Sequence, residues 1–161
     1  MLSDTDLTAL THLACALGVG VVLGLNRDLK GKPIGVRTLG LVALACCTLT
    51  EAAIQFGSAH GQEPEMVARA IQGLMAGIGF LGGGVILHTE RKVHGLTTAA
   101  MVWLTSALGV ACGLGALHLV GFALVAALAL VLLGGPFERA VHRRFTRDSS
   151  LPLDADGDDD G

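Results

Sequence analysis

Residues 96–135 read LTTAAMVWLTSALGVACGLGALHLVGFALVAALALVLLGG and contain no aspartate, glutamate, lysine or arginine. A helix needs about 20 apolar residues to cross a bilayer core about 30 Å thick, so this run is too long for one span and fits two. We expect the break near Gly113–His118, because two glycines weaken the helix there.

Three further apolar runs precede it, at Leu7–Leu25, Thr38–Gly57 and Val67–Leu87. Together with the two spans in 96–135, they predict five transmembrane helices, of which the third is rich in glycine. The sequence therefore predicts an all-α integral membrane protein with a five-span membrane domain over residues 1–135.

The composition of the 161 residues agrees with a membrane protein. Apolar residues make up 52% and charged residues 16%, against about 25% charged in an ordinary soluble domain, and mean hydropathy is +0.63. These values argue against a typical soluble enzyme, a nucleic-acid-binding module and a secreted disulfide scaffold. All the cysteines lie in apolar runs, where we expect small buried thiols at helix contacts rather than a metal site: Cys15, Cys46, Cys47 and Cys112.

Loop charges predict the orientation. The second loop, 58–66, has no lysine or arginine, whereas the first and third loops and the C-terminal segment are basic. Basic loops stay on the cytoplasmic side, so we expect the N-terminus outside and the C-terminus inside the bacterial cytoplasmic membrane. Arg69 is the exception among 11 basic residues.

Two segments follow the fifth predicted span. Residues 136–147 carry Phe137, Val141 and Phe145 at helical spacing beside several arginines. This pattern predicts a basic amphipathic cytoplasmic helix on an anionic membrane surface, with a plain stop-transfer cluster as the alternative. Residues 148–161 are acidic and poor in apolar residues, so we expect a disordered tail.

Small residues recur four apart in several spans, including Gly73–Gly77, Gly79–Gly83 and the series Ala16, Gly20, Gly24. Such spacing lets helix backbones approach closely in lipid. We expect packing within the chain, with an oligomer contact as the alternative. The string at 77–82 matches GxGxxG, but a dinucleotide site needs a strand–turn–helix context that a membrane span lacks.

Two charged residues fall within the predicted spans, Glu51 in the second and Arg69 in the third. Ionisable groups inside a bilayer are costly and usually face a partner or a cavity. Their depths match, so a Glu51–Arg69 pair is one interpretation, and a snorkelling Arg69 beside a protonated Glu51 is the other. The grouping of His88, Glu90 and His94 lacks the spacing of a known helical zinc site, and we predict no catalytic or metal residues.

Three segments together resemble the membrane domain of the MgtC/SapB family: GLNRD (24–28) followed by GVRTLGLV (35–42), the stretch from Arg69 to Gly84 with GIGFLGGG (77–84), and GLTTAAMVW (95–103). The match covers about residues 7–135. It singles out motif positions as functional candidates, to which the intramembrane Glu51 is added: Asn26, Arg27, Arg37, Thr38, Arg69, Gly77, Gly79, Phe80, Gly82, Gly95, Thr97, Thr98 and Trp103.

The resemblance implies a bacterial cytoplasmic-membrane protein linked to growth at low magnesium, in a family whose namesake supports survival in macrophages. It implies a non-enzymatic regulator without a cofactor, surrounded by lipid and acting through helix contacts. The partner would be a second copy or another membrane protein, such as the F-type ATP synthase. The alternative is a small oligomeric transporter or ion-permeation subunit. Asn26 stands where the family has a glutamate, and a soluble domain after the fifth span is not expected.

Overall fold

The computed structural model describes residues 3–89 and 92–148, and it contains five helices long and apolar enough to cross a membrane. The prediction of a five-span, all-helical membrane protein is confirmed. The helices are separated as follows: α1 (Asp4–Asp28), α2 (Val36–His60), α3 (Glu63–Val85), α4 (Leu96–Gly113) and α5 (Leu117–Asp148).

The long apolar run divides where its glycines predicted. Helix α4 ends at Gly113, and α5 begins at Leu117. Gly115 between them has a φ of +71°, a left-handed conformation that glycine adopts without steric cost. A short hairpin between α3 and α4 was not predicted: β1 (Leu87–Thr89) pairs antiparallel with β2 (Lys92–His94), with Leu87 opposite His94.

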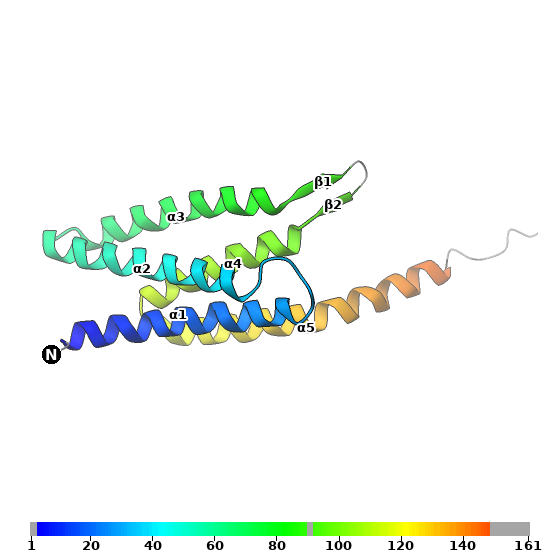
Figure 1. Cartoon of the computed structure of the whole chain (residues 1–161), viewed down its shortest axis with the longest axis horizontal. Coiled ribbons are helices and arrows are strands. Elements are labelled where there is room, and N and C mark those ends of the chain that lie inside the picture. Colours follow the sequence, from blue (N-terminus) through cyan, green and yellow to red (C-terminus); the bar gives the residue numbers. More distant parts are fainter. Residues whose placement is uncertain (1–2, 90–91, 149–161) are drawn as a thin grey trace, which may run out of the picture. The chain divides into compact units, whose positions relative to one another are not determined.

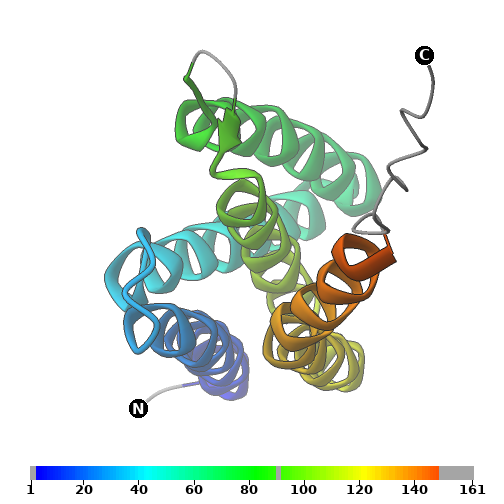
Figure 2. The same ribbon diagram turned by 90° about the vertical axis from the view of Figure 1, so that its right-hand side faces the viewer.

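Helices α2 and α4 form the centre of the α1–α4 bundle, because each of them contacts α1, α3 and the other. Figures 1 and 2 show α1 and α3 on opposite sides of this central pair. Small and hydroxyl-bearing side chains fill the contacts, among them the fully buried Cys47, Thr50, Thr105 and Ser106. The buried hydroxyls donate hydrogen bonds to backbone carbonyls of their own helix. The Thr105 hydroxyl, for example, donates to the Met101 carbonyl oxygen at 2.7 Å.

Close helix contacts within the chain depend on glycines of α1 and α4. A Cβ added to Gly20 would lie 2.6 Å from the Gly40 Cα of α2, and one added to Gly109 would lie 2.6 Å from the Ala43 carbonyl oxygen. Both distances are shorter than any real side chain tolerates, so these positions need glycine. The small-residue packing predicted for the first helix is therefore confirmed at Gly20, beside the fully buried Ala16.

The same prediction is wrong for α3. A Cβ added at Gly73, Gly77, Gly79 or Gly83 would meet nothing within 4 Å in the part of the chain that the structure describes. Of the third helix's span, 11% is buried, against 56% for α4. These glycines point away from the bundle because the inward face of α3 is formed by other residues, including the buried Ile78 and Gly82. The helix is also unbroken from Glu63 to Val85.

Helix α5 continues through Pro136 to Asp148. Residues 136–147, predicted as a separate short helix, therefore extend the fifth helix, although an internal proline removes one backbone hydrogen bond from it. The chain divides into two compact units, Met1–Leu124 and Val125–Gly161, and α5 belongs to both. From residue 149 onward, the predicted acidic tail lies outside the described residues.

Candidate functional site

The guanidinium of Arg27 is buried at the C-terminal end of α1, with 4% of the residue exposed. Its Nε donates to the carbonyl oxygens of Pro33 at 3.2 Å and Ile34 at 2.9 Å. One terminal nitrogen donates to Pro33 at 2.7 Å and to the hydroxyl oxygen of Thr98 at 2.7 Å. The planar fork of an arginine suits such simultaneous bonds, and it joins the α1–α2 loop to α4.

The α1–α2 loop is shaped to present these carbonyls. Ile34 has a φ of +62°, an unfavourable conformation for a β-branched residue, and Arg27 accounts for it by holding the Ile34 carbonyl. Asp28 accepts a hydrogen bond of 3.0 Å from the Val36 backbone N–H, which caps the start of α2. A Cβ at Gly35 would overlap the Asp28 carboxylate, which would have to move away from the Val36 N–H.

The start of α4, which follows the β1–β2 hairpin, lies beside the Arg27 guanidinium. Gly95 precedes the helix with a φ of +91°, and a Cβ there would collide with the Val85 carbonyl oxygen. This turn places Thr98 in the first turns of α4, buried at 6% exposure, facing Arg27. Gly82 on α3 lies against α4, with the position of its missing Cβ 3.8 Å from the Ala99 Cβ. The structure therefore brings Arg27, Thr98, Gly95 and Gly82, all predicted candidates, to one end of the bundle.

Asn26 lies next to this cluster. Its side-chain nitrogen Nδ2 is buried and has no hydrogen-bond partner among the described residues. A buried amide without a partner costs free energy. In the family resemblance this position corresponds to a glutamate, whereas here the Asn26 Nδ2 atom lies without a hydrogen-bond partner among the described residues.

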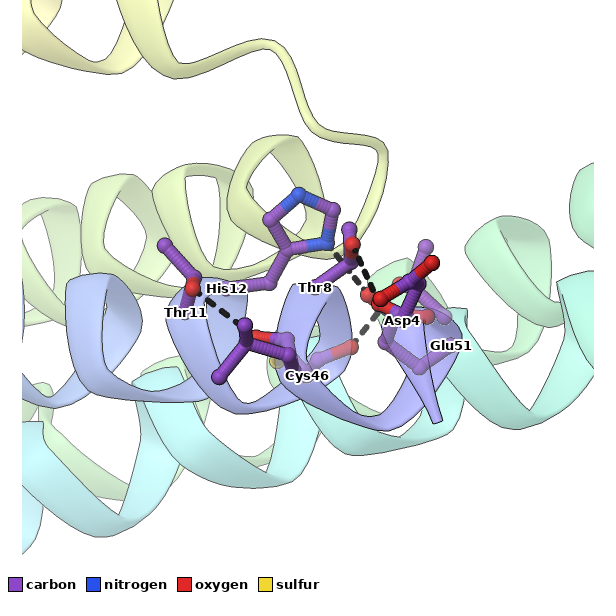
Figure 3. Close-up of polar contacts among 8 residues, drawn as sticks. Asp4, Thr8, Thr11, His12, Cys46 and Glu51 are labelled. Carbon is purple, nitrogen blue, oxygen red and sulfur yellow. Dashed lines mark hydrogen bonds and ion pairs between the residues drawn. The ribbon is translucent and has the colours of Figure 1, made fainter. Parts of the chain in front are cut away.

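A second polar contact lies toward the opposite end of the bundle. The Nδ1 atom of His12 on α1 contacts the Oε1 atom of Glu51 on α2, and both side chains are 15% exposed (Figure 3). His12 comes eight residues after the start of α1 and Glu51 nine residues before the end of α2. The ring edge of His12 also lies 3.3 Å from the place of a Cβ on Gly115, in the turn between α4 and α5. The His12 imidazole thus links α1 to α2 and lies beside this turn.

The predicted Glu51–Arg69 pair is wrong. Glu51 is paired with His12, and Arg69 is exposed on α3. Sequence reasoning passed over His12, although the rule that drew attention to Glu51 applies equally to a histidine within an apolar span. The position of His12 along α1, inside the apolar span, could have identified it as a candidate partner for Glu51.

The remaining candidates are not part of either polar cluster. Arg37 and Thr38 are exposed on the first turn of α2, and Thr97 is exposed on the first turn of α4. Trp103 is 48% exposed and Phe80 is 83% exposed. Gly77 and Gly79 lie on the open surface of α3.

The cysteines are free thiols, and Cys46, Cys47 and Cys112 are buried as predicted, whereas Cys15 is partly exposed. Within residues 3–89 and 92–148, no group of three histidine, cysteine, aspartate or glutamate side chains is arranged to hold a metal ion. The chemistry available at the two clusters is therefore hydrogen bonding and charge pairing between helices.

Comparison with known proteins places this geometry in context. The family model described as "MgtC family" matches residues 13–140. The chain is 37% identical to an uncharacterised protein of Haemophilus influenzae, over 91% of this chain and 64% of that protein. It is 38% identical to protein SrpB of Synechococcus elongatus, over 92% and 91% of the two chains. It is 33% identical to protein MgtC of Salmonella typhimurium, over 91% of this chain and 58% of that protein. No solved structure matches the chain.

Proposed function

The chain belongs to the MgtC family, and we propose that it is a non-enzymatic regulator in the bacterial cytoplasmic membrane. In this proposal it supports magnesium homeostasis and adaptation to low magnesium through helix contacts with a membrane-protein partner. The family resemblance makes the F-type ATP synthase the first candidate partner. The alignments span about two thirds or less of several relatives' lengths, so activities of those whole proteins come to this chain only as proposals.

One observation carries the proposal: buried ionisable side chains of the bundle are engaged within the chain. Arg27 donates to Pro33, Ile34 and Thr98, and Glu51 contacts His12. A transporter uses its intramembrane charges to bind and release its substrate. Here these charges hold helices together, which favours a protein that works as a rigid binding surface.

The exposed surface supports contacts of that kind. Helix α3 presents glycines with open space beside them, and Phe80 protrudes between them with 83% of its surface exposed. In lipid, such a surface permits close approach of another helix. In the orientation expected from the loop charges, the Arg27 cluster would lie on the cytoplasmic side and the His12–Glu51 pair in the outer half of the membrane.

A second candidate is a small oligomeric permeation subunit for magnesium or another cation. It is favoured by Glu65, a carboxylate exposed on α3, because carboxylates line the pathways of cations. Several copies would be needed to surround a path, because one chain contributes five helices.

Two measurements on the same protein distinguish these functions. The first is growth at limiting magnesium of a bacterium that lacks its own family member and expresses this chain. The second is magnesium influx into liposomes containing the purified protein, followed with a trapped magnesium-sensitive dye. The regulator is expected to restore growth without influx above that of empty liposomes. Saturable influx, abolished by Glu65→Gln, would instead establish the permeation subunit.

The growth assay needs a matched pair of variants. Arg27→Gln removes a buried guanidinium from the polar cluster, whereas Arg37→Gln removes an exposed one from the next helix. We expect the first variant to lose growth support and the second to retain it. Growth that fails even with the unaltered chain, at normal membrane levels, would contradict the proposed role.

A further inference from the structure

The outward side of α3 has a defined composition. At helical spacing it carries Glu65, Arg69, Gly73, Ala76, Phe80 and Gly84, all exposed. We refer to these six residues as the α3 face. Gly73 and Gly84 have nothing within 4 Å of a built Cβ, so the other helices of the α1–α4 bundle do not cover them.

The α3 face carries charges of both signs. Glu65 and Arg69 are separated by one helical turn, and neither makes an ion pair within the described residues. Arg69 comes six residues after the start of α3, about 9 Å along the helix at 1.5 Å per residue. An arginine at that depth is stabilised by an acidic partner within reach of its long side chain.

We propose that the α3 face is the contact surface between two copies of this chain, with Arg69 of each copy paired with Glu65 of the other. Copies inserted in the same orientation bring equal residue numbers to equal depth. Arg69 then lies about 6 Å above or below Glu65 of its neighbour, a gap that the long arginine side chain spans. The surface is thus complementary to itself, as a two-fold contact requires.

The apolar part of the α3 face fits the same arrangement. Gly73, Ala76 and Gly84 leave a shallow surface, and Phe80 stands out from it with 83% exposure. When two such helices cross, each phenylalanine can enter the space beside the glycines of the other, in the manner of a knob in a hole. In lipid alone, these two charges could pair only with each other along the same helix.

Cross-linking tests the contact in a bilayer. Ala76→Cys places a thiol at the centre of the face, and mild oxidation of membranes should convert this variant to a covalent dimer. The parent chain with its four native cysteines is the control and should stay monomeric on a non-reducing gel. Absence of the dimer from the Ala76→Cys variant would overturn the proposal.

Charge exchange tests the pairing. Oligomeric state is measured by single-molecule photobleaching of the full chain in nanodiscs. Arg69→Glu and Glu65→Arg should each reduce the dimer fraction at least several-fold, because like charges then meet, and the double exchange should restore it. Dimers unaffected by either single exchange, or not restored by the double exchange, would contradict the pairing.

A steric variant completes the test. Gly73→Leu fills the face and should give monomers, whereas Gly18→Leu on α1 is a matched control, since it also has nothing within 4 Å. Helical content, measured by circular dichroism, verifies that both variants fold. If Gly73→Leu does not fold, the cross-linking of Ala76→Cys decides whether the dimer contact exists. The inference is independent of the magnesium-linked role: a monomer that still supports growth would reject the dimer alone.

Discussion

The guanidinium of Arg27 donates a 2.7 Å hydrogen bond to the hydroxyl of Thr98, 71 positions later in the sequence. This bond joins two of the family's sequence motifs, the one at the end of α1 and the one at the start of α4. The same guanidinium holds the carbonyls of Pro33 and Ile34 in the loop before the third motif. Three separated motifs therefore meet around one buried side chain.

Arg27→Lys is expected to destabilise the protein although the charge is retained. A lysine ammonium cannot donate to Pro33, Ile34 and Thr98 with the fixed geometry of the guanidinium. Loss of partners for a buried charged group costs about 3–5 kcal/mol. Thermal unfolding in detergent, followed by circular dichroism, measures the change. Arg37→Lys, at an exposed position, should stay within about 0.5 kcal/mol of the parent chain; equal effects of the two variants would contradict the assignment.

The His12–Glu51 contact should appear as coupling in a double-mutant cycle. His12→Ala and Glu51→Ala each remove one partner, so the double variant should be less destabilised than the sum of the two singles by about 0.5–3 kcal/mol. The comparison cycle with Arg69→Ala and Glu51→Ala should be additive within about 0.5 kcal/mol, because Arg69 is not Glu51's partner. Coupling to Arg69 but not to His12 would reverse the conclusion.

Gly109→Ala is expected to destabilise the bundle by about 1–3 kcal/mol, the usual cost of overpacking. The added Cβ would lie 2.6 Å from the Ala43 carbonyl oxygen and 3.0 Å from the Cys46 Cβ, so α2 and α4 would have to separate. Gly79→Ala is the matched control, since it meets nothing within 4 Å on α3. Chemical or thermal unfolding of both variants measures the difference. A larger loss at Gly79 would mean that the close contact lies elsewhere.

The loop charges predict an outside N-terminus and an inside C-terminus. Gly61→Cys lies in the turn between α2 and α3, and Gly157→Cys lies in the acidic C-terminal segment. A membrane-impermeant maleimide should label the first variant in intact cells and the second after permeabilisation. Labelling in the opposite order would invert the topology while leaving the five helices unchanged.

The number of helices was determined by the sequence, because it depends on local quantities, whereas their limits were not: the fifth span was expected to end at residue 135, and α5 continues to Asp148. Apolar length sets how many spans fit a bilayer, and Gly113 and Gly115 marked the break between α4 and α5. The family relationship was also readable from the sequence, since motifs such as GLTTAAMVW are contiguous. The β1–β2 hairpin escaped prediction because its strands have three residues each, too few for a periodic pattern.

The tertiary structure alone decided which polar groups meet and which glycines are covered. Glu51 had two candidate cations at suitable depth, His12 and Arg69, and depth along a helix leaves rotation about the helix axis undefined. Small residues four apart likewise occur on α1, α3 and α4. They form close contacts at Gly20 and Gly109 but not at Gly77. Which face of each helix turns inward depends on how all the neighbouring helices pack together, a non-local relationship that spacing within one segment does not contain.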